Sequence, residues 1–139
     1  MSSTIEQSVR VRLISDAPHS MAVPVVLRYS DTDPFAVRMA FPPEACLNET
    51  GVTWAFARSL LDAGLRAPAG DGDVHIWPCG RVQTMIELRS PEGVALLQLD
   101  TASLRRFLVR SYATVPAGNE AAAQDLDRAL AALLGNARG

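Results

Sequence analysis

Residues that could perform chemistry are few in this sequence, and their spacing completes no recognisable site. The two histidines, His19 and His75, have no cysteine or carboxylate at the spacing that a zinc site needs. No serine or cysteine stands in a nucleophile motif, and neither a P-loop nor a dinucleotide-binding glycine motif is present. We therefore predict no catalytic residue, no cofactor-binding residue and no metal site, and we do not expect an enzyme.

Two pairs of aspartates could be interpreted as calcium ligands, but turns explain them better. Asp31 and Asp33 stand in the segment Asp31-Thr32-Asp33-Pro34, where aspartate side chains and a proline favour a turn. Asp71 and Asp73 lie in a predicted loop over 66–73, and their charge would repel a phosphate group. A calcium site made only of protein needs roughly six or more oxygen ligands, which neither pair supplies.

The two cysteines, Cys46 and Cys79, lack the CxxC spacing of redox and zinc motifs. We interpret them as buried or half-buried thiols in a reducing cytoplasm, with a disulfide as the less favoured alternative. The sequence shows no signal peptide and no apolar run of about 20 residues that could span a membrane. These features predict a cytoplasmic protein without membrane insertion.

The charge of the chain argues against a general nucleic-acid binder. The formal net charge is −2 and the pI is near 5.6, whereas such binders need clustered positive charge to displace counterions. All 13 basic side chains are arginines, which a GC-rich genome explains more simply than phosphate binding does. We therefore expect no nucleic-acid partner.

One arginine cluster is the candidate partner-binding site. Arg105, Arg106 and Arg110 fall on a predicted helix over 101–112, away from its apolar face. Arg106 and Arg110 are four residues apart, where like charges cost roughly a few tenths of a kcal/mol. Protein interfaces favour arginine, which supports a role in partner binding. An ordinary solvated helix face is the alternative, and the sequence leaves both open.

Aromatic residues raise a second binding hypothesis. Trp54 and Phe56 are two residues apart in a predicted strand and so share one face, where Trp77 and Tyr29 could join them as a base-stacking platform. We prefer a core cluster, because a chain with 6% aromatic residues needs most of them for packing. For a core Trp54, replacement by alanine would cost about 3–5 kcal/mol.

Most of the first two thirds of the chain alternates apolar and polar residues, which is typical of strands. Pro24 cannot donate a ladder hydrogen bond, which predicts an edge strand or a bulge there. Ser90-Pro91-Glu92-Gly93 predicts a tight turn between two hairpin strands, with a positive φ at Gly93. The predicted strands are 5–14, 21–29, 36–41, 52–56, 73–78, 82–88 and 94–99.

Three helices are predicted around these strands. A short helix over 58–63 would end at Gly64, as a left-handed cap. The helix over 101–112 would begin after Asp100 as its N-cap, and Asn119 would cap a last helix that ends at Gly135-Asn136. The apolar faces of these two helices are Leu104, Phe107, Leu108 and Ser111, and then Leu126, Leu130, Leu133 and Leu134.

Strands followed by helices predict a single α+β domain over 1–139, with a bent antiparallel sheet of about seven strands and C-terminal helices. The helices must cover a sheet face or a subunit interface. Sheet edges that need cover, together with an alanine-rich helix over 121–134 that permits close packing, favour a homo-oligomer.

The order and spacing of several segments point to one family. These segments are Arg28-Tyr29, Asp33-Pro34-Phe35-Ala36-Val37, Trp54-Ala55-Phe56-Ala57-Arg58, Leu60-Leu61, Gly64-Leu65, Gly72-Asp73-Val74, Trp77-Pro78, Ser90-Pro91-Glu92-Gly93, Phe107-Leu108 and Val115-Pro116-Ala117-Gly118-Asn119-Glu120. In this order they resemble the SsgA-like sporulation and cell-division proteins of actinomycetes. Within that family, the sequence is most similar to the SsgB branch. The resemblance spans positions 5–134.

The resemblance implies a non-enzymatic regulator of sporulation-specific cell division. Such a protein would position septa by recruiting the tubulin-like GTPase FtsZ through protein contacts, alongside SsgA-type division proteins, in the cytoplasm at the septum. The family fold is similar to that of Whirly-type proteins, and the family assembly implies a ring-like homotrimer. The Whirly-like sheet also keeps open the alternative of single-stranded nucleic-acid binding, although a shared fold does not carry that function with it.

Overall fold

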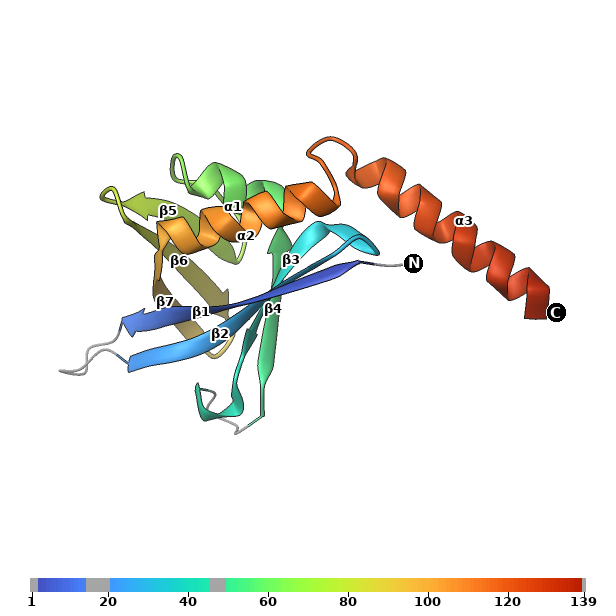
Figure 1. Ribbon diagram of the computed structural model, residues 1–139. Helices are drawn as coiled ribbons and strands as arrows, with labels where there is room; N and C mark the ends of the chain where they lie inside the picture. Colours follow the sequence, from blue (N-terminus) through green and yellow to red (C-terminus); the bar gives the residue numbers. More distant parts are fainter. Residues whose placement is uncertain (1–2, 15–20, 46–49, 139) are drawn as a thin grey trace.

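The computed structural model describes residues 3–14, 21–45 and 50–138 of the 139-residue chain. Strands occupy most of the first hundred residues, and two longer helices follow them (Figure 1). The elements are β1 (Thr4–Ile14), β2 (Met21–Ser30), β3 (Asp33–Phe41), the 3-10 helix η1 (Pro43–Ala45), β4 (Val52–Ala57), α1 (Arg58–Gly64), β5 (Val74–Cys79), β6 (Gln83–Ser90), β7 (Gly93–Asp100), α2 (Thr101–Thr114) and α3 (Glu120–Arg138).

The strands form one curled antiparallel sheet in the order β4-β3-β2-β1-β7-β6-β5. The helices α1 and α2 lie together over the curled sheet, whereas α3 projects away from the body of the molecule (Figure 1). α1 contacts β3, β4 and β5, and α2 contacts β1, β2 and β7. This arrangement confirms the predicted α+β fold with a bent antiparallel sheet and C-terminal helices.

One hydrophobic core lies between the sheet and the first two helices. The apolar face predicted for α2 is confirmed, because Leu104, Phe107, Leu108 and Ser111 are all buried. The strands contribute alternate residues to the same core, as their apolar pattern predicted. Fully buried strand residues include Val11, Val25, Leu27, Val37, Met39, Ile76, Ile86 and Leu97.

The predicted hairpin is confirmed, while Pro24 has a different setting from the one expected. β6 and β7 pair from Gln83 to Ser90, and Gly93 has a φ of 144°. Pro24 was expected at a sheet edge or a bulge, but β2 lies inside the sheet. The pairing of β2 with β3 begins at Val26, so Pro24 lies where β2 extends past β3 and no ladder donor is needed.

The two edges of the sheet differ. At the β5 edge, the backbones of Ala69 and Ile76 exchange hydrogen bonds of 2.8 and 3.0 Å, and Pro78 offers no donor. α1 also packs against β5. β4 forms the other edge, and no described strand pairs with its outer side. One edge is therefore covered by the chain itself and the other is open.

Three of the four aromatic residues considered belong to the core or pack against it, and only Trp77 lies outside. Tyr29 and Phe56 belong to the core, and Trp54 is half-buried against it. Trp54 therefore packs against the core as predicted but is only half-buried, so we expect its removal to cost less than the full burial value. Trp77 lies on β5, at the opposite edge of the sheet from Trp54 on β4, and outside the core cluster.

Several element ends differ from the predictions for local physical reasons. β3 begins at Asp33 because the turn needs only Asp31 and Thr32, and the turn then joins two paired strands directly. α3 continues to Arg138, so the pair at 135–136 does not end it. Gly64 lies inside α1 and its φ is not positive, so it is not a left-handed cap.

The role of Gly64 is close packing against β5. A Cβ atom at this position would lie 2.4 Å from both Cβ and Cγ2 of Ile76. Ile76 is fully buried in the middle of β5, so it has no free space into which it could move. A glycine here lets α1 approach the sheet closely.

We expect Gly64→Ala to destabilise the fold by about 1–3 kcal/mol, because the added methyl overpacks a filled core. Gly72→Ala is the matched control, since a Cβ there meets nothing within 4 Å and the backbone φ is not positive. Urea unfolding of both variants checks the prediction. Equal stability of the two would contradict the close-packing role.

Candidate partner-binding surfaces

The predicted arginine cluster lies on the exposed side of α2. Arg105 and Arg106 are exposed and form no hydrogen bond or ion pair with the described part of the chain. Arg110 is also exposed, but it donates hydrogen bonds of 3.2 Å to the backbone oxygen of Glu6 and to Gln7 Oε1. The three side chains are therefore exposed, and those of Arg105 and Arg106 keep all their donors for a partner.

A second surface is the leucine stripe of α3, formed by Leu126, Leu130, Leu133 and Leu134. These side chains are between 44% and 65% exposed, although the sequence pattern marks them as an apolar face. Ala123, in the first turns of α3, packs against the core, and α3 contacts β3. Past that contact the helix extends into solvent (Figure 1). A contiguous exposed apolar stripe of this kind indicates an interaction surface.

The joint between the three helices is centred on one buried arginine that the sequence analysis did not single out. Arg58, the first residue of α1, is 1% exposed. Its guanidinium lies between the rings of Tyr29 and Tyr112, 4.6 and 4.5 Å from their centroids. Cation–π contacts of this kind are stronger in a desolvated site than at the surface. The two rings hold the guanidinium plane in one orientation.

Arg58 also completes the C-terminal end of α2. Its Nη1 donates to the backbone oxygens of Ser111 and Val115 at 3.1 and 2.7 Å, and approaches Ser111 Oγ at 3.4 Å. The last carbonyls of a helix lack partners within the helix, and the helix dipole favours a cation there. Arg58 therefore joins the start of α1 to the end of α2.

Glu120 extends the same joint to α3. Its Oε2 lies 3.5 Å from Arg58 Nη2, and its Oε1 accepts a hydrogen bond of 2.6 Å from the Gly118 backbone N–H. Partial burial would raise the pKa of Glu120, but the backbone N–H groups and the Arg58 cation outweigh it, so this pKa lies below its ordinary value. The first turn of α3 is thus tied to the body by an ionised carboxylate.

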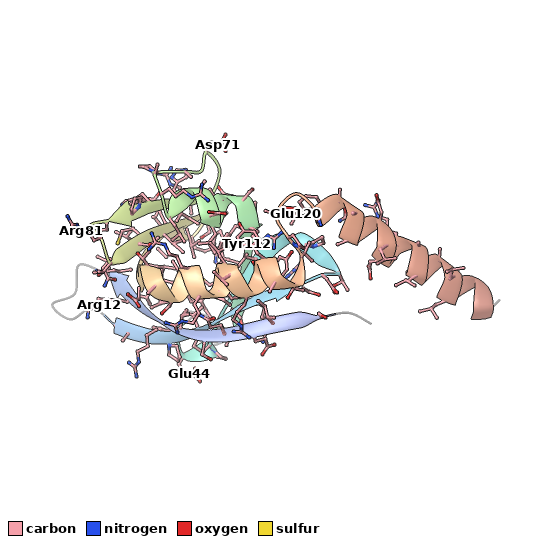
Figure 2. The ribbon with its side chains drawn as sticks, turned by 45° about the horizontal axis from the view of Figure 1, so that its top comes forward. Arg12, Glu44, Asp71, Arg81, Tyr112 and Glu120 are labelled. Atoms are coloured by element: carbon pink, nitrogen blue, oxygen red, sulfur yellow. The ribbon has the colours of Figure 1, made fainter. Side chains whose placement is uncertain are left out.

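A shallow hollow of about 270 Å³ opens over this joint, lined by residues of α1 together with Tyr112, Ala117 and Glu120. Figure 2 shows Tyr112 and Glu120 at the place where α3 leaves the body. Within the hollow, Asp62 pairs with Arg66 at 2.6 Å and accepts a hydrogen bond from the Tyr112 hydroxyl. Its cations and carboxylates are matched in pairs, as expected of a structural joint between the helices.

The sequence around Arg58 contains one local indication that this residue has a structural role. A cation in the first turn of a helix faces the positive end of the dipole, so an arginine there needs another reason. Its contacts come from Tyr29, Ser111 and Tyr112, which are far away in the sequence. This indication could have identified Arg58 as a residue with a structural role, but its partners can be seen only in the folded structure.

The other histidine, cysteine and aspartate residues considered in the sequence analysis form surface pairs, are exposed or lie outside the described residues. His75 pairs with Glu87 at 3.2 Å on the sheet surface. Cys79 is an exposed free thiol, so the expectation of a buried or half-buried thiol is wrong for it, while Cys46 and His19 lie outside the described residues. Asp33 pairs with Arg38 at 2.7 Å in the turn region. Among the described residues, no group of three or more His, Cys, Asp or Glu could hold a metal ion.

Membrane spanning was also tested on the described residues. None of their helices combines the length and the apolar character needed to cross a bilayer.

The tyrosines at the joint give a direct spectroscopic test. Burial, as the largest cause, raises the pKa of Tyr29 and of Tyr112 to about 12, and the hydrogen bond to Asp62 adds to the effect at Tyr112. These are the only two tyrosines of the sequence. We expect near-ultraviolet absorbance to show phenolate near pH 12 in folded protein and near pH 10 in urea. Because the folded pKa is the higher one, stability should fall as the pH rises from about 10 to 12.

A folded-state titration near pH 10 would contradict this description of the joint. The variant Tyr112→Phe serves as the control, because it leaves Tyr29 as the single source of the signal.

Comparison with known proteins identifies the family. The sequence model of the family described as "Streptomyces sporulation and cell division protein, SsgA" matches residues 23–120. The sporulation-specific cell division protein SsgB of Streptomyces coelicolor is 42% identical over 137 residues, which covers 96% of this chain and 98% of that protein. SsgB of Kineococcus radiotolerans is 40% identical over 135 residues, covering 94% of this chain and 79% of that protein.

Solved structures agree with the sequence comparison. An SsgA-like sporulation-specific cell division protein from Thermobifida fusca has a TM-score of 0.82 and 37% identity, covering 94% of this chain and 95% of that one. An SsgB structure from work on longitudinal cell division during sporulation of Streptomyces coelicolor has a TM-score of 0.79 and 39% identity, covering 88% and 97%. The chain belongs to the SsgA family of sporulation and cell division proteins.

Proposed function

We propose that this chain is a non-enzymatic regulator that positions sporulation septa by recruiting FtsZ through protein contacts. The observation that carries the proposal is its similarity, over nearly the whole chain, to proteins named sporulation-specific cell division protein SsgB. In this proposal it acts in the cytoplasm at the septum, alongside SsgA-type division proteins.

The surfaces of the molecule support a role in protein binding. The leucine stripe of α3 and the arginines of α2 are exposed on two different helices. The hollow at the helix joint has its charges matched in pairs. Tyr29 and Phe56, two of the aromatic residues considered for base stacking, are buried, which gives no support to single-stranded nucleic-acid binding.

The proposal includes a homo-oligomer, with a trimer favoured by the family. The leucine stripe supports it, since a second copy would remove four large apolar side chains from water. The alanines at 121–123, 129, 131 and 132 leave the helix narrow enough for close approach of another element.

The FtsZ contact can be tested with purified proteins. We expect this chain, immobilised on a sensor, to bind FtsZ of the same organism, and to bind a single-stranded oligonucleotide weakly at low salt. Tight oligonucleotide binding with a steep salt dependence, and none to FtsZ, would favour the nucleic-acid alternative instead. A lysozyme of similar size serves as the unrelated protein control on the sensor.

Self-association can be tested by light scattering at tens of micromolar. We expect a mass well above the 14.9 kDa of one chain, and a shift towards one chain in the double variant Leu126→Gln, Leu133→Gln. The matched control is Val94→Gln, Val109→Gln, which changes two equally exposed apolar residues elsewhere. A monomeric parent protein would refute the oligomer, and a dimer would refute the trimer. Equal masses of the two double variants would show that the stripe is not the interface.

A further inference from the structure

β4 is an edge strand without the usual protection of an edge. It pairs with β3 on one side, and among the described residues no strand or backbone hydrogen bond from another segment reaches its other side. Exposed edges are commonly blunted by lysines, prolines or β-bulges, which discourage pairing with other chains. β4 has none of these, because its sequence is VTWAFA and its pairing with β3 runs without a register shift from Val52 to Ala57.

The opposite edge of the same sheet is closed. The Ala69 backbone bonds to β5, and Pro78 in β5 offers no donor. Figure 1 shows β4 as the outermost strand on its side of the sheet, while α1 and α2 lie over the sheet. The β4 edge therefore keeps a row of unpaired backbone donors and acceptors that the β5 edge does not offer.

The side chains of β4 divide into an apolar face and a face of small, exposed residues. Phe56 is buried in the core, Trp54 is half-buried against it, and Val52 is 37% exposed. These three residues alternate along the strand, so they share the core side of the sheet. Thr53 and Ala55 are exposed on the other face. The apolar layer of the core is therefore only partly covered where it reaches the open edge.

We propose that the β4 edge binds an extended, uncharged segment of a partner protein, which adds to the sheet as a further strand and carries apolar side chains at alternate positions. The inference deepens the proposed function and rests on it only for the view that the partner is a protein. It assigns the contact to a different surface from the leucine stripe of α3 and from the arginines of α2.

The chemistry of the edge defines the segment it fits. Backbone hydrogen bonds along the edge supply affinity, and the side chains that alternate along the added strand supply specificity. Residues directly opposite each other on neighbouring strands share one face, with Cβ atoms roughly 4.5–5.5 Å apart. Apolar residues opposite Val52 and Trp54 would therefore remove their remaining exposed surface from water. A charged residue there would lose its hydration without gaining a partner, because β4 carries no charge.

An extended segment fits this edge better than a second copy of the whole chain does. Both ends of β4 continue closely into other elements, since η1 ends at Ala45 and α1 begins at Arg58, the residue that follows Ala57. A second β4 would bring its own η1 and α1 against the same elements of the first copy. A segment without such flanking elements needs only the six residues of the strand for its pairing.

The probe is a labelled peptide that alternates threonine with valine over six residues between two terminal glutamines, with both ends blocked. The control peptide has proline in place of the central valine, because proline cannot donate and disrupts an added strand. Binding to the full-length protein is followed by fluorescence anisotropy at low and at high salt. We expect the valine peptide to bind with little dependence on salt, and the proline peptide to bind at least about tenfold more weakly.

Trp54 reports whether the peptide lies at this edge. The sequence has two tryptophans, so Trp77→Phe leaves Trp54 as the only one. Adding the unlabelled valine peptide to this variant should shift the Trp54 emission to shorter wavelength, because the exposed part of the indole leaves water. The reciprocal variant Trp54→Phe, which keeps Trp77 at the opposite edge, should show no such shift.

A pair of lysine variants tests the edge itself. The edge variant combines Thr53→Lys with Ala55→Lys, and the matched control combines Ser8→Lys with Ala22→Lys on strands inside the sheet. All four positions are exposed, and each variant changes the formal net charge from −2 to 0. We expect the edge variant to bind the valine peptide about tenfold more weakly, because lysines beside an added strand lose water and freedom. The control should change affinity by about twofold or less, and melting curves show whether both variants fold.

The inference would be overturned by the absence of peptide binding, by equal binding of the two peptides, or by equal weakening in the two lysine variants. A smaller light-scattering mass for the edge variant alone would also overturn it, since β4 would then pair two copies. The FtsZ measurement separates the two proposals. Peptide binding without FtsZ binding would remove the proposed function and leave the edge site, whereas FtsZ binding without peptide binding would remove the edge site alone.

Discussion

The placement of the helices depends on a permanent positive charge held inside the protein at Arg58. Burying a guanidinium is costly unless its charge and its donors are matched. Here two tyrosine rings stack on the group, Nη1 donates to the carbonyls of Ser111 and Val115, and the Glu120 carboxylate neutralises the charge from 3.5 Å, although Nη2 itself has no hydrogen-bond partner among the described residues. Because these partners come from β2, α3 and the end of α2, the contacts of one side chain tie together three helices and one strand. The matched charges in the hollow follow from this joint.

The fold could be predicted from the sequence where the pattern is local. Alternation in β1, β2 and β7 and the turn before Gly93 are properties of short segments, and the structure confirms them. Predictions failed where a contact distant in sequence decides the outcome. Gly64 looks like a cap until β5 is placed against it, and only the short reach of β3 explains how Pro24 fits into a strand inside the sheet. Trp54 and Trp77 share a residue type but lie on opposite edges of the sheet.

The candidate binding surfaces show the same division. The arginines of α2 could be located from helical periodicity, since only one face of that helix can meet the core. The leucine stripe of α3 was visible as a pattern, but a pattern cannot tell a buried face from an uncovered one. That difference decides whether the stripe stabilises the fold or is available to another molecule.

The unequal edges of the sheet limit how copies of this protein could join strand to strand. An open edge is a template for pairing with another chain, and sheets with two open edges can extend without limit. Here the β5 edge is occupied by the Ala69 backbone and by Pro78, so only β4 can accept a new strand. A molecule with one open edge can pair its sheet with one other strand, and after that no open edge remains. Strand pairing through the described edges would therefore join two copies without extending the sheet further.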